Sequence, residues 1–251
     1  MTCNSFNKNK FATPATNSTQ VEKRGSVYYS PMSEELWKAI EDDDLSEVQR
    51  LIAKGAIVNS LIYSYQSDYG DGATTPLNLS ISLTHNEIAF YLLDQGAEIE
   101  AFIEGADAPM FDAVFANNLE IAKWLLGKGA GVNRREDDSE HSEVPLHAAA
   151  ESGHLEMIKL LVDKGADLNA ASGWYGWTAL HLAVTGGHNA TVAFLLDAGA
   201  DLNLRDKNGN IPLDLAIEKG LTKIALILRV HSAKQCSHPL QAIYEVVTIL
   251  Y

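Results

Sequence analysis

One nine-residue phrase recurs five times along this chain. Its copies are LIAKGAIVN from Leu51, LLDQGAEIE from Leu92, LLGKGAGVN from Leu125, LVDKGADLN from Leu161 and LLDAGADLN from Leu195. Successive copies begin 41, 33, 36 and 34 residues apart. Repetition at about 33 residues is typical of a solenoid, because a unit of that size cannot bury its apolar side chains alone and must stack on its neighbours. This spacing restricts the fold more than any other feature of the sequence.

A second phrase recurs with almost the same interval. Its copies are TPLNLS from Thr75, APMFDA from Ala108, VPLHAA from Val144, TALHLA from Thr178 and IPLDLA from Ile211. Both phrases occur together in TALHLAVTGGHNATVAFLLDAGADLN, residues 178–203, and in PLHAAAESGHLEMIKLLVDKGADLN, residues 145–169. The combined pattern resembles the ankyrin repeat over about residues 34–230. The resemblance implies an all-α solenoid, in which stacked helix-turn-helix units carry projecting β-turn fingers.

The residues of a single unit explain why two short helices would form. Thr178 suits a helix N-cap, and Leu180 begins the apolar positions of a first helix. Gly187 interrupts that helix, and Leu195 belongs to the buried stripe of a second, antiparallel helix. Gly199 follows where the second helix should end in a left-handed conformation, which glycine adopts at little cost.

The repeats also define the expected domain boundaries. Residues 1–32 are rich in Thr, Asn, Ser and Lys without a sustained period, and we expect a disordered tail there. Residues 33–232 should form the solenoid, with an N-terminal cap over 33–59 and repeats beginning near residues 60, 101, 134, 170 and 204. Residues 233–251 should form a C-terminal capping helix, because their apolar positions recur three and four residues apart. The alternative is a helix that docks on another protein or completes itself in a longer chain.

Charge and composition favour some classes of partner over others. The net charge is −14, and residues 1–32 carry +3, so that the remainder carries −17. Nucleic acids and anionic membranes attract basic surfaces, and we therefore expect neither as the main partner. The sequence contains no apolar run of the roughly 18 residues that would span a bilayer. Its two cysteines, Cys3 and Cys236, predict no disulfide framework and favour an intracellular, cytoplasmic location.

Candidate contact residues are those in which a repeat departs from the pattern. In the ankyrin family, the first helices and the fingers line a concave surface. The resemblance places the following residues of the first helices there: Glu41, Asp42, Ser82, Leu83, Phe115, Ala116, Glu151, Ser152, Thr185, Glu218 and Lys219. Phe115 is unexpected, because this helix position is usually polar. Aromatic side chains are favoured as binding anchors, and acidic neighbours would attract a basic partner.

Two predicted fingers carry additional aromatic residues. The first full repeat has about eight extra residues that include Tyr63 and Tyr65, and the fourth has one extra residue beside Trp174, Tyr175 and Trp177. These side chains either contact a partner or pack the loops onto the stack, and the resemblance implies packing between neighbouring repeats for Trp177. The predicted partner-binding residues are Phe115, Trp174, Tyr175, Leu83, Tyr63, Tyr65, Glu151 and Thr185.

The histidines follow the repeat and do not form a catalytic group. His147 and His181 occupy the fourth position of the TPLH phrase, while His154 and His188 follow the break between helices, which indicates structural hydrogen bonds to local backbone. His141, His231 and His238 belong to no constellation of partner residues that would indicate catalysis. We find no HExxH, paired CxxC, glycine-rich phosphate loop or GxSxG motif. The sequence therefore predicts a monomeric protein-binding module that is not an enzyme and needs no cofactor or metal.

Other functions remain open at this stage. One alternative is an enzyme, or an enzyme subunit, whose chemistry lies in a divergent segment such as 60–75 or 231–251. Another is a secreted effector of an intracellular bacterium, which would act on a host protein in the host cytoplasm. Asparaginyl hydroxylases recognise the Leu-to-Asn phrase of this family, which makes Asn133, Asn169 and Asn203 candidate modification sites.

Overall fold

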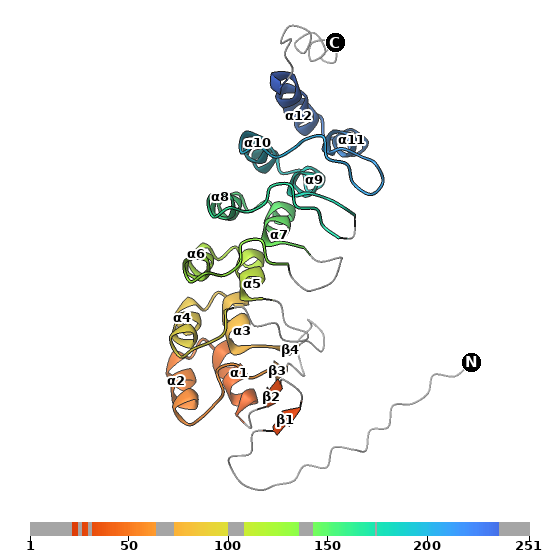
Figure 1. Ribbon diagram of the computed structural model, residues 1–251. Coiled ribbons are helices and arrows are strands. Elements are labelled where there is room, and N and C mark those ends of the chain that lie inside the picture. The colour runs from red at the N-terminus through yellow and green to blue at the C-terminus, as the bar shows by residue number, and fades with distance from the viewer. Residues whose placement is uncertain are drawn as a thin grey trace, which may run out of the picture.

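Six antiparallel helix pairs are stacked along one axis in the part of the chain that the structure describes (Figure 1). The computed structural model describes residues 22–24, 27–29, 32–63, 73–99, 108–135, 143–173 and 175–235. The helices are α1 (Ser33–Glu41), α2 (Leu45–Ala53), α3 (Pro76–Ser82), α4 (Asn86–Asp94), α5 (Pro109–Phe115), α6 (Leu119–Gly127), α7 (Pro145–Ser152), α8 (Leu155–Asp163), α9 (Ala179–Thr185), α10 (Asn189–Asp197), α11 (Pro212–Glu218) and α12 (Thr222–Gln235). The predicted all-α solenoid is confirmed.

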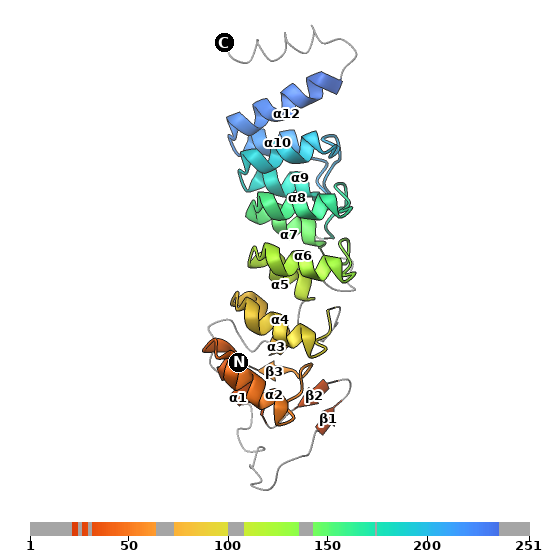
Figure 2. The same ribbon diagram turned by 90° about the vertical axis from the view of Figure 1, so that its left-hand side faces the viewer.

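The first and second helices of the units form two parallel layers. The odd-numbered helices lie in one row, and the loops that lead to them project on the side away from the even-numbered helices (Figure 1). The even-numbered helices form the opposite layer, which faces the viewer in Figure 2. A first helix therefore contacts the first helix of the next unit, its own second helix and the base of a finger.

Short strands occur at two places near the N-terminal end. β3 (Ile62–Tyr63) pairs antiparallel with β4 (Ala73–Thr74) and forms the base of the longest finger. β1 (Glu22–Arg24) pairs antiparallel with β2 (Val27–Tyr29), with Glu22 opposite Tyr29. The expectation of disorder over residues 1–32 does not account for this pairing. Three-residue strands are too short to produce a detectable alternation in the sequence. Residues 1–21 lie outside the described residues.

Each first helix ends in the same backbone conformation. A positive φ recurs at one register in all six described pairs, with values of 54°, 62°, 51°, 70°, 76° and 67° at Asp43, Thr84, Asn117, Gly153, Gly187 and Gly220. This residue reverses the chain so that the second helix can return along the first. Thr84 is the least favourable of the six, because a β-branched side chain is costly in the left-handed region.

A glycine ends each of the first five second helices, but not the sixth. Gly199 has φ 100°, as the sequence predicts, and the N–H of Ala200 donates to the carbonyl of Leu195 at 2.9 Å. In α12, Ser232 stands at the register of Gly199, and the helix continues to Gln235. It is 14 residues long, whereas α10 has nine.

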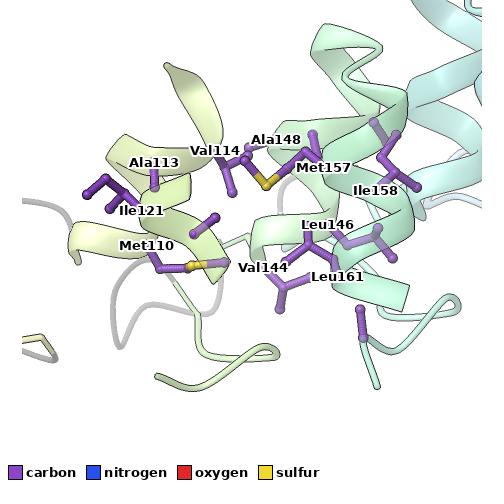
Figure 3. Packing of buried hydrophobic residues seen from close by; sticks show 14 of the residues in the cluster. Met110, Ala113, Val114, Ile121, Val144, Leu146, Ala148, Met157, Ile158 and Leu161 are labelled. Atoms are coloured by element: carbon purple, nitrogen blue, oxygen red, sulfur yellow. The ribbon is translucent and has the colours of Figure 1, made fainter. Parts of the chain in front are cut away.

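One apolar cluster runs through the whole stack. Within it, Met110 and Val114 of α5 lie beside side chains of the next unit, which include Leu146 of α7 and Met157 of α8 (Figure 3). Successive first helices are in contact, from α1 and α3 to α9 and α11. Because every apolar layer is shared between neighbouring units, the stability of one unit depends on the next.

We predict that Leu195→Ala lowers the free energy of unfolding by about 2–5 kcal/mol, since Leu195 is fully buried and the change leaves a cavity. Urea denaturation followed by circular dichroism measures the effect. The matched control is Leu83→Ala, because Leu83 is partly exposed and should contribute less than about 1 kcal/mol. Equal effects of the two substitutions would contradict the packing described here.

Candidate functional site

The end of every first helix contributes two residues to a row that follows the stack. We call this the helix-end row: Glu41, Asp42, Ser82, Leu83, Phe115, Ala116, Glu151, Ser152, Thr185, Gly186, Glu218 and Lys219. Ala116 and Thr185 are half-buried, and the other members are exposed. They share a register because each lies one or two positions before the positive-φ residue that ends the helix. The helix-end row contains four of the predicted contact residues.

The centre of the helix-end row is apolar. Leu83 is 39% exposed and Phe115 is 51% exposed, and they lie at the ends of the neighbouring helices α3 and α5. The Phe115 ring lies 6.5 Å from the ring of Phe111, which is fully buried one helical turn earlier. The buried ring of Phe111 thus supports the ring of Phe115 on its inner side. An exposed aromatic ring on a rigid helix can anchor a partner with little loss of conformational entropy.

The ends of the helix-end row are acidic. Glu41 and Asp42 lie on one side of the apolar centre, and Glu151 and Glu218 lie on the other. Lys219 is the row's one cation, and its Nζ lies 3.5 Å from the carbonyl oxygen of Thr185.

One more acidic group interacts with a residue of the row. Glu143 lies two residues before α7 begins at Pro145 and is half-buried. Burial raises the pKa of the Glu143 carboxyl, and the negative charge of Glu151 raises it further. The two carboxylates therefore repel each other.

The finger of the fourth repeat presents an aromatic stack. Ser172 donates its N–H to the carbonyl of Trp177 at 2.7 Å, which closes the finger. The rings of Tyr175 and Trp177 stack with centroids 4.8 Å apart. Tyr175 is exposed and Trp177 is half-buried. Trp174 and Tyr65 lie outside the described residues, and for Tyr63 only the backbone in β3 is described.

Trp177 connects its finger to the next one. Its indole N–H donates to a carboxylate oxygen of Asp206 at 3.1 Å. Asp206 also accepts the backbone N–H groups of Asn208 and Asn210 at 2.9 and 2.8 Å. Burial acts to raise the pKa of Asp206, but these hydrogen bonds outweigh it and lower the pKa. Trp177 therefore has a structural role, whereas Tyr175 remains available for contact.

The histidines of the TPLH phrase hold the fingers by hydrogen bonds to backbone, as predicted. Nδ1 of His147 accepts the N–H of Val144 at 3.2 Å, and its Nε2 lies 2.8 Å from the carbonyl oxygen of Ala170. His181 bonds in the same way to Thr178 and Asn210. Since Nε2 must donate and Nδ1 must accept, both rings are neutral. Burial lowers the pKa of each histidine.

The remaining histidines of the repeat join successive units. Those after the helix break bond to carbonyl oxygens of the preceding unit: His85 to Ile40 at 2.8 Å, His154 to Val114 at 3.1 Å and His188 to Glu151 at 2.7 Å. These bonds confirm the structural role predicted for His154 and His188. They also hold successive units in a fixed register along the stack.

His231, which lies outside the recurring phrases, connects two helices. Its Nε2 lies 3.0 Å from Oδ1 of Asp197, and its Nδ1 lies 3.0 Å from the carbonyl oxygen of Ile227. The hydrogen bond from His231 lowers the pKa of Asp197. The pair joins α12 to α10 across 34 residues of sequence, and no short motif could have revealed it.

The asparagines that end the first phrase also connect neighbouring units. Oδ1 of Asn133 accepts the N–H of Asp167 at 2.8 Å, and its Nδ2 donates to the carbonyl of Gly165 at 3.0 Å. Oδ1 of Asn169 accepts the N–H of Asp201 at 2.9 Å. Because these side chains form a ladder between the loops, the structure accounts for the recurrence of asparagine at this position.

The described part of the chain contains no group of three or more His, Cys, Asp or Glu side chains that could hold a metal ion. None of its helices combines the length and apolar character needed to cross a membrane.

Comparison with known proteins identifies the same repeat. The family model for ankyrin repeats in three copies matches residues 110–206 and 146–238. A curated ankyrin repeat protein of Rickettsia felis is 39% identical over 64 residues, which make up 25% of this chain and 28% of that protein. The chain thus spans well under half of that relative's length.

A solved structure shares the fold over most of the chain. The crystal structure of an ankyrin repeat domain from Acinetobacter baumannii AYE superposes with a TM-score of 0.63 at 27% identity. The match covers 79% of this chain and 97% of the other.

We predict that acidification from pH 7.5 to 5.5 lowers the free energy of unfolding. His147 and His181 have lowered pKa values in the folded state, so the unfolded chain binds more protons as the pH falls through the ordinary histidine value of 6.5. Their stabilising contribution is fully present above that pH and is lost below it. Urea titrations at both pH values measure the change.

His181→Asn is the matched variant for this test, because the chain already uses Asn at the same register in α3. There, the N–H of Asn78 donates to Oγ1 of Thr75 at 3.1 Å, and the Thr75 hydroxyl bonds to Oδ1 of Asn78 at 2.7 Å. The variant should lose less stability between pH 7.5 and 5.5 than the parent. An unchanged pH dependence would show that His181 does not contribute to it.

Proposed function

The chain belongs to the ankyrin repeat family, and on that premise we propose that it binds one partner protein through the helix-end row and the adjacent fingers. Ankyrin repeats are generally protein–protein interaction modules. The observation that carries the proposal is the exposed Phe115, which is supported by Phe111 and lies near the exposed Leu83. Two exposed apolar side chains on neighbouring helices form a candidate anchor site for a partner.

The chemistry of the surface defines the partner. Leu83 and Phe115 offer a small apolar contact, and Glu41, Glu151 and Glu218 surround it with negative charge. We propose a partner segment in which one or two apolar side chains are flanked by Lys or Arg. The apolar contact would supply most of the affinity, and the charges would accelerate encounter and select against acidic partners.

The fingers extend the proposed contact surface. Tyr175 is exposed, and its ring is held against Trp177, which in turn is fixed by Asp206. A tyrosine supported in this way offers a large, rigid contact area and a hydroxyl group for hydrogen bonding. We include Trp174, Tyr63 and Tyr65 in the proposed surface on the basis of the sequence alone.

The proposal also concerns the setting. We place the protein in the cytoplasm, or in a host cytoplasm if a bacterium delivers it, and we propose that it acts as a monomer without chemistry of its own. The scarcity of cysteine supports a reducing compartment. A mass measurement in solution tests the monomeric state. Assay of the purified protein against a panel of hydrolase substrates tests the enzyme alternative.

We predict that Phe115→Ala combined with Tyr175→Ala weakens partner binding at least tenfold, because both substitutions remove exposed aromatic contact area. The partner is first recovered from the native cell by pull-down, and its Kd is then measured by calorimetry. The free energy of unfolding should change by less than about 1 kcal/mol, since neither ring is buried.

Leu226→Ala is the control for this experiment. Leu226 is also an exposed apolar residue, but it lies in α12 and outside the helix-end row. Its substitution should leave the Kd unchanged. Wild-type affinity in the double variant would refute the proposed surface even though the fold stands.

We predict that Glu151→Lys combined with Glu218→Lys reduces the association rate roughly tenfold at low salt and weakens its salt dependence, because the charges act at long range. Stopped-flow measurements at two ionic strengths test this. Asp94→Lys combined with Asp163→Lys is the charge-matched control, since both residues are exposed and lie at the ends of α4 and α8 that are opposite the helix-end row. A rate that rises with the reversed charges would exclude a basic partner.

A further inference from the structure

The last described unit exposes an apolar residue that every other unit buries. The residue three positions before the positive-φ turn is fully buried in the first five first helices, where it is Ile40, Ile81, Val114, Ala150 and Val184. At the same register in α11, Ile217 is 53% exposed. Each of the other five belongs to a first helix that contacts the first helix of the following unit. Among the described residues, no further first helix follows α11.

The second helix of this unit, α12, also exposes an apolar side chain. Leu226 of α12 is exposed and occupies the register of Phe90 in α4. Phe90 packs edge-on against Trp124 of the next second helix, with ring centroids 6.4 Å apart. A side chain at this register can therefore contact the following unit, as Phe90 does. We call the surface formed by Ile217 and Leu226 the end face.

The sequence after α12 contains one more copy of the first-helix phrase. Residues 239–245 read PLQAIYE, against PLDLAIE at 212–218 and PLHAAAE at 145–151, with Pro, Leu and Glu at identical positions. Pro begins four of the described first helices, where its missing N–H costs no hydrogen bond. The final Pro comes only 27 residues after Pro212, whereas α3 and α5 begin 33 residues apart.

The shorter interval matches the altered end of α12. This helix lacks the glycine turn of the other second helices and continues to Gln235, so the usual turn is not formed at Ser232. The bond between His231 and Asp197 fixes the added helical turns against α10. Only residues 236–238 then separate α12 from the phrase. Three extended residues span about 10 Å, which is enough to join two antiparallel helices.

From these observations, we propose that residues 239–251 of this chain form a helix that occupies the place of a sixth first helix on the end face and covers Ile217 and Leu226. The segment supplies apolar side chains at three- and four-residue spacing, at Leu240, Ile243, Tyr244, Val247 and Leu250. Such spacing gives a helix one apolar side, which matches one apolar surface. The proposal concerns the end of the stack and is independent of the helix-end row.

Hydrogen–deuterium exchange on the full-length protein tests this proposal. The amides of residues 240–250 should exchange at least tenfold more slowly than those of an isolated 239–251 peptide. Ile217→Glu should abolish that protection, because it places a charge in the proposed contact. Since Ile217 is half exposed, the substitution should leave the protection of α7 to α10 unchanged.

Phe115→Glu is the matched control for this variant. Phe115 is 51% exposed and also lies at the end of a first helix, but it is remote from the end face. The substitution Phe115→Glu should leave the protection of residues 240–250 from exchange intact. Protection that survives Ile217→Glu would overturn the proposal, as would unprotected amides in the parent protein. Protection that depends on protein concentration, with a dimer mass in light scattering, would instead place a second copy on the end face and also overturn it.

Discussion

Each helix pair of this protein leaves apolar side chains that only the next pair can cover, and the rest of the structure depends on this contact. The buried residues of α5 and α7 belong to one layer, and so do those of α7 and α9. Backbone-directed bonds from His85, His154 and His188 fix the register of this packing. Because burial is shared, a unit has little stability of its own, and the fold requires both a minimum number of units and a means of closing each end.

The same constraint explains how much of the fold the sequence could predict. A position that contacts the next unit must keep its character in every copy, so Leu195, Gly199 and His147 can be recognised from their recurrence. Contacts that occur once leave no such pattern. The bond between Trp177 and Asp206 and the bond between His231 and Asp197 each join residues 29 or 34 positions apart, and neither pair recurs elsewhere in the described stack.

The candidate site could be predicted only in part, for the same physical reason. The repeat register correctly indicated that Leu83 and Phe115 lie on the surface, because their positions follow from the helix phrase. It also favoured Tyr175 over Trp177 as a contact residue, but it could not identify the group that holds Trp177, since the finger departs from the pattern in length. The hydrogen bond from Trp177 to Asp206 identifies that group.

Side chains that hold the stack together and side chains of the proposed binding surface therefore point in different directions. Side chains that point along the stack are committed to the neighbouring unit, whereas those at the end of each first helix point away from it and are free to vary. In this chain, most of the charged residues at these positions are acidic, and they lie on both sides of the apolar pair Leu83 and Phe115. The buried Phe111 supports Phe115. An exposed apolar ring that is only partly covered by its own chain is explained most simply by a partner that covers the rest. Under the proposed function, the stack determines where a partner binds, while the residues of the helix-end row determine which partner is bound.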